Sequence, residues 1–126
     1  MIKGVDSILI ASENPKVLAD FYKEKVGAEY IDEFVYGEDS ATGYMLKLGS
    51  VGLNILPHSE VHGKNDSPAR IMVNIEVDDC EKECQKVKDN GVKVVTEMYH
   101  MEGYGYIGTF EDPDGNYFQL VQVRSS

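Results

Sequence analysis

The chain has 126 residues, enough for one ordinary domain or two small fused modules, and its hydrophobic content of 42% is typical of a globular protein. Its formal net charge of −10 disfavours binding to nucleic acid or to an anionic membrane surface, because both need clustered Lys and Arg. We expect a cytoplasmic protein, since the sequence has neither a long apolar run nor a signal-peptide pattern at its N-terminus.

The first half of the chain predicts one strand, one helix and three further strands. Residues 5–11 have the composition of a strand, and a helix follows them. Asn14 suits its N-cap and Pro15 its first helical position, while Gly27 suits its end. The three further strands are predicted at residues 28–36, 42–48 and 51–56.

The second half predicts the same order of elements. Residues 71–77 form a strand, and Asp78 with Glu81 suits the N-cap and capping box of a helix at about 79–90. Gly91 follows as the helix terminator. Three further strands are predicted at residues 92–99, 104–110 and 117–123.

Two cysteines lie on the second predicted helix. Cys80, Cys84 and Val87 form an apolar stripe at helical spacing, which is typical of residues that face a core. A disulfide is not expected in a cytoplasmic protein, and no further metal ligands lie nearby at a recognisable spacing. We therefore interpret both cysteines as core residues.

The two halves align as an internal repeat. Equivalent positions are Gly27 with Gly91, Ser7 with Met72, and Asn54 with Gln119. We predict an α+β fold in which residues 1–126 form a single domain of two tandem βαβββ modules. The modules span residues 1–57 and 69–124, a polar linker spans 58–68, and together the modules form a cupped mixed sheet with the helices outside.

Two segments resemble a known family. FYKEKVGAEY after the first helix and EDPDGNYFQLVQ near the end are similar to the vicinal oxygen chelate superfamily. That group includes glyoxalase I, extradiol dioxygenases, fosfomycin resistance enzymes and bleomycin resistance proteins. The resemblance runs from about Met1 to Val123. It implies a divalent metal in the cup, held by His or Glu, occasionally Gln, from the first and fourth strands of each module.

The four positions that this resemblance assigns to metal ligands carry other residues, namely Ser7, Asn54, Met72 and Gln119. Together they supply no formal charge and no imidazole. A tight divalent site needs anionic or imidazole ligands to replace the hydration shell of the ion. We therefore predict that these positions bind neither the metal of the family nor another cofactor.

The cup itself keeps the character of a small-molecule pocket. Alternation along the strands predicts an apolar lining with a few uncharged hydrogen-bonding groups, and tyrosine rings could stack on a planar ligand. The predicted ligand-binding residues are Ser7, Asn54, Met72, Asn74, Tyr106, Tyr117 and Gln119. The alternative is that these groups pair with one another in a closed core.

The three histidines offer a different metal site. His58 and His62 flank Glu60, but the neighbouring Pro57 and the polar residues that follow favour a loop over a rigid helix. His100 lies beside a predicted hairpin and could act as a base or a ligand donor. We interpret the histidines as surface residues and keep a metal at them as the alternative.

Three functions follow from these observations. The leading one is metal-independent binding of a small organic molecule by a homodimer, similar to the sequestration carried out by bleomycin resistance proteins, with no catalytic residue assigned. The alternative is a metal-dependent glyoxalase, lyase or dioxygenase with non-standard ligands. The third is a structural or regulatory dimer with a filled cavity.

Overall fold

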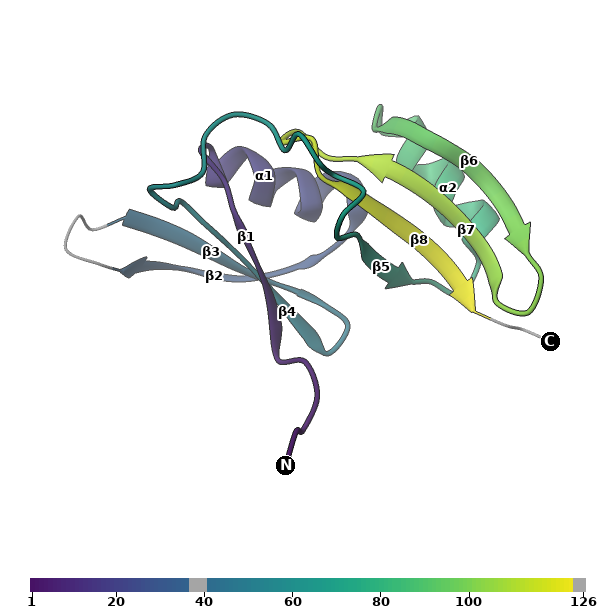
Figure 1. Cartoon of the computed structure of the whole chain (residues 1–126), viewed down its shortest axis with the longest axis horizontal. Helices are drawn as coiled ribbons and strands as arrows, with labels where there is room; N and C mark the ends of the chain where they lie inside the picture. Colours follow the sequence, from purple (N-terminus) through teal and green to yellow (C-terminus); the bar gives the residue numbers. More distant parts are fainter. Residues whose placement is uncertain (37–40, 124–126) are drawn as a thin grey trace. The chain divides into compact units, whose positions relative to one another are not determined.

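The computed structural model describes residues 1–36 and 41–123 and divides the chain into two compact units, Met1–Gly63 and Lys64–Ser126. The boundary falls inside the predicted linker 58–68, and residue 124, the predicted end of the second module, lies outside the described part. Each unit contains one four-stranded mixed sheet and one α-helix (Figure 1). The predicted α+β fold of tandem βαβββ modules is therefore confirmed. Within the described residues, no helix is long and apolar enough to cross a membrane.

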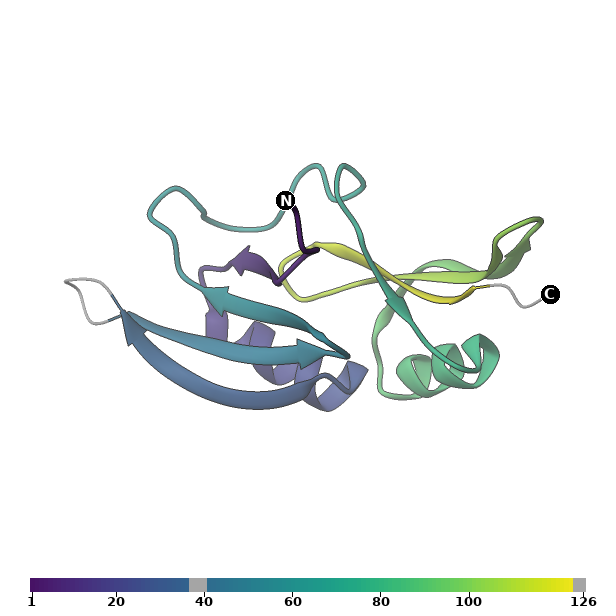
Figure 2. The same ribbon diagram turned by 90° about the horizontal axis from the view of Figure 1, so that it is seen from below.

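The first unit forms a sheet in the order β1-β4-β3-β2, in which β1 is parallel to β4 and the other neighbours are antiparallel (Figure 2). Its elements are β1 (Ser7–Ala11), α1 (Pro15–Phe21), η1 (Tyr22–Val26), β2 (Glu29–Tyr36), β3 (Ala41–Leu48) and β4 (Val51–Leu56).

The first helical segment, α1 together with η1, begins and ends where the sequence predicts, although α1 itself ends at Phe21. Asn14 occupies the N-cap without a side-chain capping hydrogen bond, and its own amide donates to Ser12 Oγ at 3.0 Å. Beyond α1 the chain continues as the π-helical turn η1. This turn ends at Gly27, whose φ of 102° is one that L side chains rarely adopt. The core of this unit includes Leu18, Phe21, Tyr22, Leu46, Leu53 and Ile55.

The second unit repeats this topology in the order β5-β8-β7-β6, with β5 parallel to β8. Its elements are β5 (Val73–Glu76), α2 (Cys80–Asp89), β6 (Lys93–Met101), β7 (Gly105–Glu111) and β8 (Tyr117–Val123). Cys80, Cys84 and Val87 are all buried, which confirms the predicted core stripe of the helix.

The cap of α2 lies one residue later than predicted. Asp79, not Asp78, is the N-cap, and its Oδ1 accepts from the amide of Lys82 at 3.1 Å. The amide of Val77 donates to the carbonyl of Val121 at 2.8 Å, so the chain leaves the sheet where the predicted strand 71–77 ends. Both of the adjacent aspartates suit an N-cap by residue type, and the second of them has the extended cap conformation, with φ −136° and ψ 97°.

The strand register confirms the internal repeat at the level of single residues. In the first unit Leu9 of β1 pairs with Asn54 of β4, and in the second unit Asn74 of β5 pairs with Gln119 of β8. Both pairings are parallel, and both join the first strand of a unit to its fourth. The repeat thus places the equivalent positions Asn54 and Gln119 on equivalent strands, each in the middle of its strand.

Candidate functional site

Three polar side chains form a hydrogen-bonded row across the second sheet. Thr109 of β7 donates its hydroxyl to Gln119 Oε1 of β8 at 2.7 Å, and Gln119 Nε2 donates to Asn74 Oδ1 of β5 at 2.8 Å. We call these three residues the amide row. Asn74 pairs with Gln119 and Thr109 pairs with Gln119 in the strand register, so the row follows directly from the strand alignment.

The amide row lies on the face of the sheet opposite α2. The α2 face carries Gly108, where an added Cβ would stand 2.6 Å from Cys84 Sγ, together with Phe110 and Phe118, whose rings stack at 5.8 Å. Because side chains alternate along a strand, Thr109 and Gln119 point to the other face. The amide row itself is therefore neutral, while the carboxylates of Glu76 and Glu111 share the open face by the same alternation, the latter paired with Lys93.

The row explains how an amide is accommodated on a largely apolar sheet. Thr109 is buried, at 6% exposure, whereas Gln119 is half-buried and Asn74 is exposed. A buried hydroxyl without a partner costs about 1–3 kcal/mol, and the Gln119 carbonyl removes that cost. Thr109 is one of the residues that the sequence analysis did not identify. The strand register is the signal that could have found it, because Thr109 stands opposite Gln119 on the neighbouring strand.

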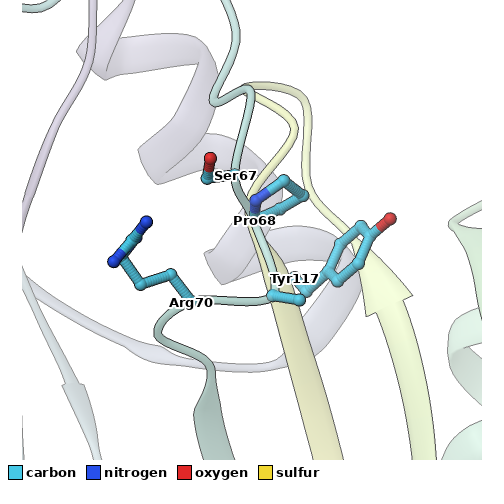
Figure 3. A pocket seen from close by; sticks show the side chains of 5 residues that line it. Ser67, Pro68, Arg70 and Tyr117 are labelled. Atoms are coloured by element: carbon cyan, nitrogen blue, oxygen red, sulfur yellow. The ribbon is translucent and has the colours of Figure 1, made fainter.

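A shallow, open hollow lies near one end of the amide row. Its volume is about 450 Å³, and its lining consists of Ser67, Pro68, Ala69, Arg70 and Tyr117 (Figure 3). Tyr117 shares a face of β8 with Gln119, two residues away, so the hollow and the row lie on the same side of the sheet. Small-molecule pockets commonly occupy about 300–1,000 Å³, which includes this volume.

Of the five lining residues only Tyr117 belongs to the predicted set, and Arg70 is the one charged residue among the other four. Arg70 is exposed, and no ion pair recorded among the described residues involves it. The available sequence signal was an arginine beside an apolar Pro-Ala pair in a chain with a net charge of −10. In Figure 3 the Arg70 side chain extends from one side of the segment and the Tyr117 ring stands on the other.

The DPDGN turn holds this segment in place. Buried Asp112 accepts from the amides of Asp114 and Asn116, each at 2.9 Å, and from Asn116 Nδ2 at 3.0 Å. Asn116 Oδ1 then accepts from Asn65 Nδ2 at 3.0 Å, and the Asn65 amide donates to the Asp114 carbonyl at 2.8 Å. The turn thereby joins the segment before Arg70 to the start of β8.

The predicted residues of the first unit lie on the open face of their sheet. Ser7 pairs with Gly52, and an added Cβ at Gly52 would stand 3.1 Å from Ser7 Cβ. Asn54 is half-buried between Leu9 on β1 and Met45 on β3. The alternate residues Leu53 and Ile55 are buried in the core of the unit. Leu9 is 59% exposed on the open face.

The structure brings only part of the predicted set together. Asn74 and Gln119 are hydrogen-bonded, and Tyr117 shares their face. Met72 precedes β5 and is 38% exposed. Tyr106 pairs with Gln122 on β8 and has the same parity along β7 as Gly108, so it points to the α2 face and away from the amide row. Convergence of Ser7 and Asn54 with the second-unit residues stays a prediction.

The histidines make local contacts. His58 Nδ1 accepts from the amide of Glu60 at 3.0 Å, and His62 lies 3.4 Å from Glu13 Oε2 and 3.0 Å from the Ser59 carbonyl. The ring of His100 packs against that of Tyr106, with centroids 4.9 Å apart. In neither unit do three or more His, Cys, Asp or Glu of the described residues gather in a way that could hold a metal ion.

The side chains at the four positions that the family resemblance assigns to metal ligands do not fit a divalent metal. Gln119 Oε1, the one amide oxygen that could replace a carboxylate at this position, already accepts from the Thr109 hydroxyl. Ser7, Asn54 and Met72 add a hydroxyl, an amide and a thioether, which are neutral groups and poor substitutes for carboxylate or imidazole.

Comparison with known proteins places this chain in a family. The model of the glyoxalase/bleomycin resistance protein/dioxygenase superfamily matches residues 4–120. A lactoylglutathione lyase of Neisseria meningitidis serogroup A is 30% identical over 111 residues, which cover 84% of this chain and 80% of that protein.

Two solved structures share the fold. TnmS3, an antibiotic binding protein from Streptomyces sp. CB03234, superposes with a TM-score of 0.78 at 21% identity, over 98% of both chains. The fosfomycin resistance protein FosX from Listeria monocytogenes, in a mutant form complexed with Mn(II), superposes with a TM-score of 0.74 at 17% identity, over 98% of this chain and 95% of its own.

Proposed function

Because the chain belongs to the glyoxalase/bleomycin resistance protein/dioxygenase superfamily, we propose that it binds a small organic molecule without a metal, in the manner of a sequestering resistance protein. The observation that carries this proposal is the amide row. It occupies the strand position that would supply a metal ligand, and it does so with neutral groups already bonded to each other.

The open face of the second sheet offers suitable ligand contacts. Gln119 Nε2 has two hydrogens and uses one on Asn74, and the exposed Asn74 keeps its Nδ2 group for a ligand. Tyr117 adds an aromatic surface beside them. An apolar surface with a few placed polar groups is the usual composition of a small-molecule site. TnmS3, which shares this fold, is described as antibiotic binding, and it supplies a structural precedent.

No catalytic residue is part of this proposal. The proposed ligand-binding side chains are amides, hydroxyls, a thioether and aromatic rings, and none is a general acid or base that titrates near neutral pH. Binding followed by release is the activity that such a set supports. We also propose that the protein acts as a cytoplasmic homodimer, which sedimentation of the purified protein and fractionation of its native cells would test.

A metal-dependent lyase is the second candidate, and one observation favours it. The similarity to lactoylglutathione lyase is 30% identity over most of the chain. This candidate requires a metal held by residues other than those at the four family ligand positions. The imidazoles available for it are those of His58, His62 and His100. Two of them lie in the first unit, where His62 contacts Glu13.

The test combines binding with activity on one preparation. Protein treated with a chelator and then dialysed is screened against small planar organic molecules by thermal shift, and hits are confirmed by calorimetry. The same preparation is assayed for lactoylglutathione formation, alone and after addition of nickel, zinc, manganese or iron(II). We expect saturable binding and no metal-stimulated activity. Metal-stimulated turnover that is lost in a His62→Ala or His100→Ala variant would replace our proposal with the lyase.

A further inference from the structure

The hollow beside Tyr117 combines a cation with an apolar wall. Arg70 supplies the only guanidinium of the described residues, and Pro68, Ala69 and Tyr117 supply the apolar wall. The ammonium groups of Lys16, Lys86, Lys88 and Lys93 are all engaged with carboxylates. Arg70 has no carboxylate partner among the described residues, so its charge is free for a ligand.

The segment that carries Arg70 is hydrogen-bonded within itself and is tied to the DPDGN turn at Asn65. The Ser67 amide donates to Asn65 Oδ1 at 2.9 Å, and the Arg70 amide donates to the Ser67 carbonyl at 3.1 Å. Asn65 is itself bonded to the DPDGN turn at Asp114 and Asn116. A side chain on a fixed backbone loses less entropy on binding than one on a free loop, so the guanidinium is partly preorganised.

Gly115 allows this close approach of the segment and the turn. An added Cβ there would stand 3.3 Å from Lys64 Cβ and 3.4 Å from the Asn65 carbonyl, and the φ of Gly115 is +81°. A larger residue would push the segment away from the turn. The hollow is therefore a built feature of the second unit, with one wall on the segment and the other on Tyr117 of β8.

We propose that this hollow binds the anionic group of a small aromatic organic acid, with the Arg70 guanidinium as its counterion and the Pro68 and Tyr117 rings against its apolar body. The inference rests on the proposed small-molecule binding function and specifies the ligand class. A guanidinium pairs with a carboxylate, sulfonate or phosphonate through two parallel hydrogen bonds, which gives such an anion preference over a neutral analogue.

The negative net charge of the chain means that binding of an anion must depend on a local cation. At −10, the protein as a whole repels anions, so an anion must be held by a specific local cation and not by a diffuse field. Binding that depends on Arg70 should therefore weaken strongly when that one charge is removed. It should also weaken with added salt, because the guanidinium is exposed.

The experiment uses a matched pair of fluorescent probes. Anilinonaphthalene sulfonate carries a sulfonate, and N-phenylnaphthylamine has a closely related aromatic body without the charge. Both are titrated, with fluorescence detection, into the folded 126-residue chain and into its Arg70→Gln, Lys64→Gln and Tyr117→Ala variants. Lys64→Gln is the matched control, because it removes the same charge from the same segment outside the lining of the hollow. Thermal unfolding confirms that each variant is folded.

We expect Arg70→Gln to weaken binding of the sulfonate about tenfold, which corresponds to about 1.4 kcal/mol, and to leave the neutral probe within about twofold. Lys64→Gln should change neither affinity by more than about twofold, and Tyr117→Ala should weaken both probes. Equal effects of Arg70→Gln and Lys64→Gln on the sulfonate would overturn the anion site while leaving small-molecule binding intact. Binding of neither probe by the wild-type protein would overturn both proposals.

Discussion

Replacing Gln119 with leucine tests whether the amide row is an integral part of the second sheet. Leucine is one bond shorter than glutamine and neither donates nor accepts a hydrogen bond. The substitution removes two bonds at once, from Thr109 at 2.7 Å and to Asn74 at 2.8 Å. The two partners differ in their access to water, and that difference sets the size of the effect.

Thr109 carries most of the expected loss. It is only 6% exposed, so in Gln119→Leu its hydroxyl is left buried without the Gln119 acceptor, at a cost of about 1–3 kcal/mol. Asn74 is exposed and regains a water molecule at little cost. Burial of the new leucine offsets part of the loss. We therefore expect Gln119→Leu to lower the free energy of unfolding by about 1–2 kcal/mol.

Urea unfolding measures this loss, with an expected midpoint shift of about 0.5–1 M for an m-value of about 2 kcal/mol/M. Thr109→Val in the Gln119→Leu background removes the stranded hydroxyl and should restore most of the stability, because replacing both partners by apolar groups is nearly neutral. Asn74→Ala is the control and should cost less than about 0.5 kcal/mol. Additive losses in the Gln119→Leu, Thr109→Val double variant would refute the reasoning.

Three further predictions concern the α2 face and the turn. Burial raises the pKa of the Cys84 thiol to about 12, with the Cys80 thiol adding to the shift, so both thiols should resist a disulfide reagent until the protein unfolds. As pH rises, the Cys84 thiol loses its proton in the unfolded chain before it does so in the folded chain. The free energy of unfolding should therefore fall above about pH 9, by up to about 1.4 kcal/mol per pH unit, in urea unfolding measured across pH. Gly108→Ala places a Cβ 2.6 Å from Cys84 Sγ and should lower the free energy of unfolding, measured in urea, by about 1–3 kcal/mol. The loss should be smaller in a Cys84→Ala background, and an equal loss in both backgrounds would contradict this packing. Asp112→Ala removes the hydrogen bonds that this buried carboxylate accepts from Asp114 and Asn116, and it should lower the free energy of unfolding by about 2–3 kcal/mol. Because the turn holds the segment before Arg70, the variant should also bind the anionic probe more weakly. Unchanged affinity for the probe would show that the turn does not support the hollow.

The order of the elements could be predicted because it depends on local patterns. Asn14, Pro15 and Gly27 mark the ends of the first helix through backbone preferences that act within a few residues. The cap of α2 was placed one residue early because Asp78 and Asp79 are the same residue type and both suit an N-cap. Residue preference alone does not distinguish two adjacent aspartates.

The site was harder to predict for the same reason. Gln119 was identified from alternation along its own strand, but its partner Thr109 follows from the register of a neighbouring strand. Tyr106 was assigned to the ligand from its ring chemistry, whereas strand parity places it on the α2 face beside His100. Arg70 belongs to a hollow formed by tertiary packing of a loop on a turn, which no periodicity shows.

The amount of divalent metal bound per chain tests the central claim most directly. Tag-free protein is purified without chelator, its metal content is measured by mass spectrometry, and its thermal midpoint is recorded with and without nickel, zinc, manganese and iron(II). A folded-state site at 100 times its dissociation constant would add about 2.7 kcal/mol of stability. Our account predicts far less than one metal per chain and no such shift for any of the four ions. Near-stoichiometric metal with a matching increase in stability would contradict it and would assign the site to residues other than Ser7, Asn54, Met72 and Gln119.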